Sequence, residues 1–367
     1  MAEPRTILCV IGTRPEAIKM APVVRALQGS TWARCLVVAT AQHRDLLDQM
    51  LSRFGIQVDC DLNLMQPGQS PSDLLARMLP ALTNVCRAET PSALLAQGDT
   101  ATVLGAALTA FHQRIPFGHV EAGLRTGDLA HPFPEEGYRQ MVSRIARWHF
   151  APTSGAAAAL HAEGVAPDQV HVTGNTCIDT LLHTIGTLPA PPIGGQRMIL
   201  LTAHRRENFG APLQSIFQGV LRVVERFPDV RLVYPVHPNL NVQTPAYTVL
   251  GGHPRISLVP PQDYFDFVDL MRQATLILTD SGGIQEEAPA LGKPVLVLRE
   301  ATERPEAIAA GVSRLVGTQA QAIEVATAQL LEQASDYRAM SDRSVSPFGD
   351  GRAAERIVEI LRADLQV

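Results

Sequence analysis

Short apolar runs alternate with segments of helical period along this chain of 367 residues. The runs are apolar throughout rather than at every second position, which is typical of parallel strands that are covered on both faces. In the first half they predict strands over 6–12, 35–40, 93–98, 117–121, 148–151 and 170–174. The segments between them predict helices over 16–27, 43–54, 72–88, 102–112 and 134–145. This alternation predicts a doubly wound α/β sheet.

A segment rich in proline and glycine, LPAPPIGG at 188–195, interrupts the pattern and is typical of a linker. The alternation then resumes, with strands predicted over 198–202, 230–236, 256–259, 275–279, 295–298 and 314–316 and a last helix over 351–365. We therefore predict two Rossmann-like domains, over 1–188 and 196–350, joined by a linker at 189–195. Ligands of such folds bind beyond the carboxyl ends of the strands, so the expected site is the cleft between the two domains.

Composition and charge exclude several classes of function. The chain has 31 Lys and Arg against 36 Asp and Glu, a net charge of −5, whereas nucleic-acid binding needs a basic surface. Its apolar stretches are shorter than the roughly 20 residues that span a bilayer, and its start lacks the pattern of a signal peptide. The five cysteines form no CxxC pair and are expected to be reduced thiols. We expect a cytoplasmic protein that binds neither nucleic acid nor membrane.

Fingerprints of bound cofactors are also missing from the sequence. It contains no GxGxxG after a predicted strand, no GxxxxGK[ST], no HExxH and no GxSxG. We therefore expect no nicotinamide cofactor and no metal, and we expect neither hydride transfer nor zinc-dependent hydrolysis.

The turn GTRPE at 12–16 follows the first predicted strand. Gly12 allows close approach of the backbone, and proline suits the first turn of a helix. Arg14 and Lys19 then lie near a helix start, where anions bind. Lys19 is one of only two lysines in the chain, the other being Lys293. The turn therefore indicates a phosphate site, and the alternative is an ordinary capped turn.

The sequence DSGG at 280–283 follows the strand predicted over 275–279. Ser281, Gly282 and Gly283 would expose several N–H groups at a helix start to one anion, which makes this the best diphosphate site in the sequence. Glu287, one turn further on, would accept hydrogen bonds from a ribose, and Arg304 follows the next strand. The alternative is a capping box formed by Ser281.

Three carboxylates end or follow strands of the first half: Asp99, Glu121 and Glu135. Carboxylates in such places suit acid–base catalysis, although each alone is more often a helix cap or part of an ion pair. His204 lies beside two arginines after the strand at 198–202 and would neutralise or protonate a leaving group. The alternative for His204 is a polar turn, and His237 is similarly placed.

Taken together, these segments resemble the non-hydrolysing UDP-N-acetylglucosamine 2-epimerases. The matching blocks are GTRPEAIK (12–19), QGDT (97–100), HVEAGLRT (119–126), PEE (134–136), HRRE (204–207), TDSGGIQEE (279–287) and TERPE (302–306). The resemblance implies a B-type glycosyltransferase fold whose C-terminal helix, within 351–367, packs back on the first domain. It also implies a cytoplasmic homodimer that interconverts UDP-GlcNAc and UDP-ManNAc. The family's route is elimination of UDP to a bound 2-acetamidoglucal, followed by re-addition.

The resemblance further assigns residues to sites. The acid–base set would be Asp99, Glu121 and Glu135, with His204 and arginines at the departing UDP. The nucleotide sugar would be bound by Arg14, Lys19, Gln262, Phe267, Ser281, Gly282, Gly283, Glu287 and Arg304, with Gln262 and Phe267 at the uracil. A regulatory site for a second UDP-GlcNAc would include Gln42, Gln69, Glu136, Arg206 and His237. Two positions depart from the family pattern: Tyr138 replaces an asparagine and Gly68 replaces an arginine.

Four alternatives stay open on the sequence alone. The substrate could be a related UDP-sugar, such as a UDP-diacetamido uronic acid. The chain could be a UDP-sugar-dependent glycosyltransferase, although three carboxylates around one sugar favour epimerisation. A hydrolysing epimerase would release ManNAc and UDP. A nucleotide-sugar sensor would bind without catalysis.

Overall fold

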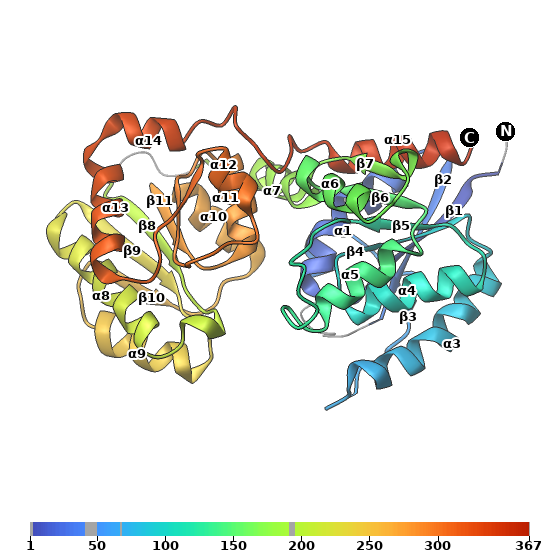
Figure 1. Ribbon diagram of the computed structural model, residues 1–367, viewed down its shortest axis with the longest axis horizontal. Helices are drawn as coiled ribbons and strands as arrows, with labels where there is room; N and C mark the ends of the chain where they lie inside the picture. Colours follow the sequence, from blue (N-terminus) through green and yellow to red (C-terminus); the bar gives the residue numbers. More distant parts are fainter. Residues whose placement is uncertain (1–2, 41–49, 67, 191–194, 367) are drawn as a thin grey trace. The chain divides into compact units, whose positions relative to one another are not determined.

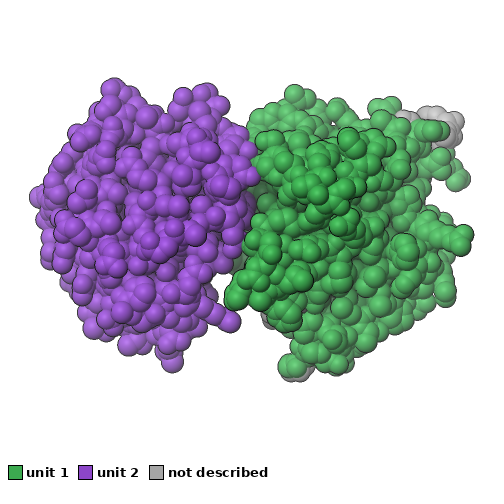
Figure 2. All heavy atoms as spheres, viewed as in Figure 1, with its two compact units in different colours: residues 1–180, 348–367 green, residues 181–347 purple. Residues whose placement is uncertain are grey.

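The computed structural model describes residues 3–40, 50–66, 68–190 and 195–366. The chain forms two compact units, which Figure 2 colours separately. Unit 1 comprises Met1–Thr180 and Phe348–Val367, and unit 2 comprises Leu181–Pro347. The boundary falls within helix α7 (Thr176–Thr187). The linker predicted over 189–195 lies partly outside the described residues and stays a prediction, as do the domain limits drawn from it.

The sheet of unit 1 is parallel throughout, in the order β3-β2-β1-β4-β5-β6-β7 (Figure 1). Its strands are β1 (Arg5–Ile11), β2 (Ala33–Ala39), β3 (Cys60–Asp61), β4 (Ala93–Gln97), β5 (Phe117–Val120), β6 (Trp148–Ala151) and β7 (Val170–Val172). Its other helices are α1 (Arg14–Gln28), α3 (Pro71–Glu89), α4 (Ala101–His112), α5 (Glu135–Ser143), α6 (Ser154–Ala162) and α15 (Ala353–Asp364), with a 3₁₀ turn at Pro167–Gln169. The sequence did not predict β3, which is only two residues long, and the helix predicted over 43–54 lies largely outside the described residues.

The C-terminal helix α15 belongs to unit 1, where it packs against α1. Asp179 in α7 accepts hydrogen bonds from the first two backbone N–H groups of α15, at 3.2 Å from Ala353 and 2.8 Å from Ala354. Since the first N–H groups of a helix have no partner within it, this side chain caps α15. Phe348 O, accepting from the N–H of Asn175 at 2.7 Å, adds a second anchor.

Unit 2 repeats the design with a parallel sheet in the order β10-β9-β8-β11-β12-β13. Its strands are β8 (Arg197–Thr202), β9 (Val230–Pro235), β10 (Ile256–Val259), β11 (Leu276–Thr279), β12 (Val295–Val297) and β13 (Ser313–Leu315). Its helices are α8 (Ala211–Arg226), α9 (Leu240–Leu250), α10 (Tyr264–Gln273), α11 (Gly282–Ala290), α12 (Pro305–Ala309), α13 (Ala320–Glu332) and α14 (Ala334–Met340), with a 3₁₀ turn at Arg206–Asn208. Apolar residues of α8, α9 and α13 pack on the sheet in one core cluster.

Both sheets have the strand order of a Rossmann fold, in which the chain reverses direction between the first and fourth strands. This confirms the predicted α/β class with two doubly wound sheets. The reversal lies between β1 and β4 in unit 1 and between β8 and β11 in unit 2. Ligands of such sheets bind beyond the carboxyl ends of the strands at this point. The loops in question are 12–13 and 98–100 in unit 1, and 203–205 and 280–281 in unit 2.

None of the helices that the structure describes is both long and apolar enough to cross a bilayer.

Candidate active site

The turn after β1 leads into helix α1, whose N-terminus is capped. Thr13 is the N-cap of α1, and the Glu16 carboxylate accepts the N–H of Gly12 at 2.6 Å and of Thr13 at 3.3 Å. The hydroxyl of Thr100, after β4, donates to the other oxygen of Glu16 at 2.7 Å. Burial raises the pKa of Glu16 to about 7. The turn at 12–16 is therefore an ordinary capped turn, as the alternative prediction had it. Arg14 makes no ion pair with any described residue.

Glu121 is held by three nitrogen donors from other parts of the chain. Lys19 in α1 forms an ion pair with its Oε1, Gln97 at the end of β4 donates to Oε2, and Asn175 donates to Oε1 at 2.9 Å. Its backbone has a φ of 64°, in the left-handed region that residues other than glycine rarely adopt. Such a conformation costs energy and persists only where the surroundings hold it, which is common at functional sites. The contacts suit an ionised carboxylate with a fixed orientation.

Asp99 and Glu136 share Arg139 of α5. The guanidinium donates to Asp99 Oδ2, at 2.9 Å from Nε and 2.8 Å from Nη2, and to Glu136 Oε2 at 3.2 Å. Glu136 also accepts the N–H of Thr126 at 3.1 Å and of Gly127 at 3.3 Å, and it is fully buried. Arg139 thereby fixes the direction of the Asp99 side chain, and Glu136 fixes Arg139.

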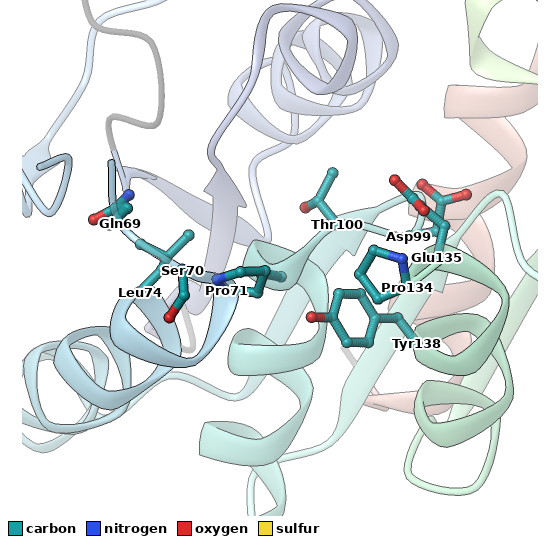
Figure 3. A pocket seen from close by; sticks show the side chains of 10 residues that line it. Gln69, Ser70, Pro71, Leu74, Asp99, Thr100, Pro134, Glu135 and Tyr138 are labelled. Carbon is teal, nitrogen blue, oxygen red and sulfur yellow. The ribbon is translucent and has the colours of Figure 1, made fainter. Parts of the chain in front are cut away.

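A pocket of about 200 Å³ opens beside Asp99 in unit 1. Its lining includes Asp99, Glu135 and Tyr138, and Figure 3 shows the carboxylates of Asp99 and Glu135 next to each other at one end. The Oε2 atom of Glu135 is buried and makes no hydrogen bond to the residues described. Two of the three predicted acid–base carboxylates therefore line one pocket. The Lys19–Glu121 pair is not in its lining.

A buried histidine supports the backbone just before Asp99. His119 in β5 lies 2.7 Å through Nε2 from the carbonyl oxygen of Gly98. Burial lowers the pKa of His119 to about 4, so the ring is neutral near pH 7 and donates this hydrogen bond. Gly98 has a φ of 91°, which glycine adopts without strain.

In unit 2, His204 follows β8 and lies over a buried carboxylate. Asp280, after β11, accepts the backbone N–H of His204 at 2.9 Å and of Arg205 at 2.8 Å. The ring of His204 stacks on that of His237, with centroids 5.5 Å apart and planes 10° apart. Burial and then the charges of His237 and Arg205 lower the pKa of His204, and Asp280 opposes them.

The start of helix α11 is lined by two guanidinium groups. A Cβ placed on Gly282 would lie 3.7 Å from Nη2 of Arg205 and 3.8 Å from Cζ of Arg304. Arg304 is oriented by an ion pair with the buried Glu286. The side chain of Ser281 makes no cap bond, so its capping-box alternative is wrong. Backbone N–H groups, a hydroxyl and two cations gather here, which suits a diphosphate.

The remaining predicted contacts of unit 2 lie on α10 and α11. Glu287 accepts a hydrogen bond from the hydroxyl of Tyr264 at 3.0 Å. Gln262 precedes α10 and donates to the carbonyl of Pro260 at 2.6 Å, and Phe267 is half-buried on the helix.

Comparisons with known proteins identify the family of the chain. The model of a family described as UDP-N-acetylglucosamine 2-epimerase matches residues 25–362. The chain belongs to this family. UDP-N-acetylglucosamine 2-epimerases of Salmonella typhimurium and Escherichia coli K12 are each 47% identical to it, over 97% of this chain and 98% of theirs. The structure of the Neisseria meningitidis UDP-GlcNAc 2-epimerase bound to UDP-GlcNAc has a TM-score of 0.89 and 45% identity, and the match covers 98% of this chain and 100% of that one. A sucrose-phosphate synthase of Thermosynechococcus elongatus, 13% identical, shares the fold with a TM-score of 0.65.

The resemblance implies a possible regulatory site, which the replacement of an arginine by Gly68 weakens, and the structure describes four of its five predicted residues. Gln42 lies outside the described residues. Arg77 donates to Gln69, and Arg206 is exposed, with no hydrogen bond or ion pair from its side chain to any described residue. Glu136 is buried under Arg139, and His237 stacks on His204. The regulatory role of these residues stays a prediction.

Several side chains that contact the predicted site residues were not predicted from the sequence. They are Gln97, Arg139, Asn175, Tyr264 and Asp280. Gln97 and Asp280 carried a usable signal, because each is polar and stands within a quoted block directly at the end of a buried strand. Asn175 carried none, since 54 positions separate it from Glu121. Among the described residues, no group of three or more His, Cys, Asp or Glu could hold a metal ion.

Proposed function

We propose that this chain is an isomerase that interconverts UDP-GlcNAc and UDP-ManNAc without net hydrolysis. Family membership and the relative bound to UDP-GlcNAc support the substrate. The observation that carries the proposal is the contrast between two carboxylates of unit 1. Glu121 is tied down by three nitrogen donors, whereas Glu135 has a buried oxygen without a hydrogen bond to any described residue. Inversion at one carbon through proton exchange needs a base on one face and an acid on the other.

The proposed reaction couples the loss of the C2 proton to the departure of UDP. The C2–H bond of an N-acetyl sugar has no neighbouring carbonyl to acidify it. In the proposed step, a carboxylate takes the C2 proton, the electrons of the C2–H bond form the C1=C2 double bond, and the electrons of the breaking C1–O bond leave with UDP. The product is a bound 2-acetamidoglucal. A second acid then protonates C2 on the opposite face while a phosphate oxygen of UDP re-forms the C1–O bond.

Unit 1 supplies the groups for proton transfer. We assign Asp99, Glu121 and Glu135 to the acid–base set. Asp99 and Glu135 line one pocket, and Glu121 follows the last residue of β5 directly. Arg139 keeps Asp99 in one orientation, and Lys19 does so for Glu121. Lys19 was predicted from the sequence as a substrate contact. Its ion pair with Glu121 supports a role in holding this carboxylate.

Unit 2 supplies the groups for the leaving UDP. The start of α11 with Arg205 and Arg304 would bind the diphosphate, and His204 would stabilise its developing charge. Glu287 would accept hydrogen bonds from the ribose. Gln262 and Phe267 would hold the uracil.

We also propose a cytoplasmic homodimer, as in the sequence-based prediction. The observation that supports self-association is the exposure of large apolar side chains on the adjacent helices α4 and α5, with Phe111 64% and Met141 47% exposed. Mass measurement by light scattering, on the natural chain and on Phe111→Ser, tests it. A dimer that dissociates in the variant supports this surface, and a natural chain that is monomeric contradicts the dimer.

The activity is tested by incubating the chain separately with UDP-GlcNAc and with UDP-ManNAc and by separating the sugar nucleotides chromatographically. The proposal predicts the same final mixture from either side. Free ManNAc with UDP would instead indicate the hydrolysing reaction. No change with either compound, but turnover of a UDP-diacetamido uronic acid, would move the substrate to that sugar. Glu121→Gln is the matched inactive control.

A further inference from the structure

Asp280 has one carboxylate oxygen that is fully satisfied and one that is not. Its Oδ2 accepts three hydrogen bonds, from the backbone N–H groups of His204 and Arg205 and from the Asn208 amide at 3.1 Å. Its Oδ1 is buried and makes no hydrogen bond to any residue in the described ranges. The residue as a whole is 0% exposed. Since a buried carboxylate oxygen without a donor is costly, a donor is expected to reach it in the working protein.

The ring of His204 faces that oxygen. Its Nδ1 lies 3.7 Å from Oδ1, which is longer than a hydrogen bond. A shift of about 1 Å would close the gap. Tyr234 also lies near Asp280 but does not compete for Oδ1, because its hydroxyl donates to the carbonyl of Ala203 at 2.6 Å.

We propose that Asp280 is a positioning residue for His204. It holds the His204 backbone through Oδ2 and accepts Nδ1–H at Oδ1, which favours the imidazolium form of the ring, in which Nε2 carries a second proton to offer to the departing diphosphate. The inference rests on the proposed function only for this last step, because the orientation and tautomer of the ring can be measured without substrate.

The charges around His204 explain why such a partner is needed. His237 on the ring face and Arg205 in the next position both disfavour a positive charge on His204, as burial does. Asp280 acts in the opposite direction. The net effect lowers the pKa of His204, so the protonated form of the ring depends on the Asp280 carboxylate. The same geometry operates wherever a buried carboxylate orients an imidazole and stabilises its protonated form.

The test variant is Asp280→Asn in the full chain. The amide has the shape of the carboxylate, and its oxygen would still accept the three donors now on Oδ2. Its NH₂ group would then face Nδ1 and exclude a proton there, so His204 would resist protonation. We expect kcat to fall at least tenfold, with the KM for UDP-GlcNAc changing by less than about threefold. The limb of the pH profile on which activity is lost with rising pH should move to lower pH.

Asn208→Ala is the matched control. It removes one donor to Oδ2 and leaves Oδ1 and the ring untouched. This variant should lose some thermal stability and keep the pH profile of the natural chain. A purely structural role for Asp280 would instead give both variants the same profile, and this outcome would overturn the proposal.

NMR of the natural chain with ¹⁵N-labelled histidine shows, without any variant, which ring nitrogen of His204 is protonated. The proposal predicts a proton on Nδ1 of His204, whereas a neutral ring protonated only on Nε2 refutes it. If Asp280→Asn fails to fold, this measurement still stands. If the chain fails to convert UDP-GlcNAc, the proposed function is wrong, and the ring NMR still reports separately on the role of Asp280.

Discussion

Glu16 offers the sharpest prediction from the structure, because one buried carboxyl should make the stability of the protein depend on pH. It is 2% exposed and has no cationic partner among the groups that determine its pKa. Burial raises this pKa from an ordinary value of 4.5 to about 7, against the opposing effect of hydrogen bonds from Gly12, Thr13 and Thr100. The charged form is therefore less favourable in the folded chain than in the unfolded chain.

The sign and size follow from linkage. A group whose pKa is higher in the folded state gives stability that is fully present below its unfolded pKa and is lost as pH rises through its folded pKa. The interval from 4.5 to about 7, at 1.36 kcal/mol per pH unit, corresponds to a loss of about 3 kcal/mol between pH 4.5 and pH 8. For a unit of this size, that is a fall in melting temperature of about 6–12 °C.

Glu16→Gln should remove this dependence. The amide oxygen can accept the N–H groups of Gly12 and Thr13, and the NH₂ group can donate to the hydroxyl of Thr100, so the loop keeps its hydrogen bonds. We expect the variant to match the natural chain near pH 4.5 and to exceed its melting temperature by about 6–12 °C at pH 8. Calorimetry or circular dichroism across this range measures the difference. Parallel melting curves at every pH would refute the reasoning.

Three further variants test the site and the fold. Glu121→Gln should lower kcat at least about 100-fold, because a proton acceptor is lost, and it should also lower the melting temperature, because Lys19 loses the partner of its ion pair; activity close to normal would remove Glu121 from the acid–base set. Asp179→Ala should cost about 1 kcal/mol of unfolding free energy in a denaturant titration, since it uncaps α15; an unchanged midpoint would contradict the cap. Arg304→Lys should weaken UDP binding about tenfold by calorimetry, because lysine lacks the planar fork that Glu286 orients; equal affinity would argue against this diphosphate site.

The elements and their order could be predicted from the sequence, because parallel strands buried on both faces leave continuous apolar runs. Residues 7–11 of β1, for example, are all completely buried. Two predicted site residues also lie at the expected ligand-binding position of the fold, since Asp99 and His204 follow strands at which the sheet reverses direction. This position is a local property of the chain, visible as a polar residue directly after an apolar run.

The partners of these groups could not be predicted in the same way. Lys19 and Asn175 approach Glu121 from 102 and 54 positions away, and no local pattern encodes such a contact. At Ser281 the spacing allowed a capping box as the alternative to a phosphate site. The hydroxyl makes no such bond in the structure. The conformation and the partners of a site residue depend on packing across the sheet. They can be determined only once the fold is known.

The central claim is that the chain inverts C2 of a UDP-N-acetyl sugar by breaking its C2–H bond. Proton NMR of UDP-GlcNAc incubated with the chain in D₂O tests this most directly. The account predicts that UDP-ManNAc appears and that deuterium replaces the C2 proton in both sugars. Epimerisation with the C2 proton fully retained, or an unchanged spectrum at high concentrations of the chain, would contradict it.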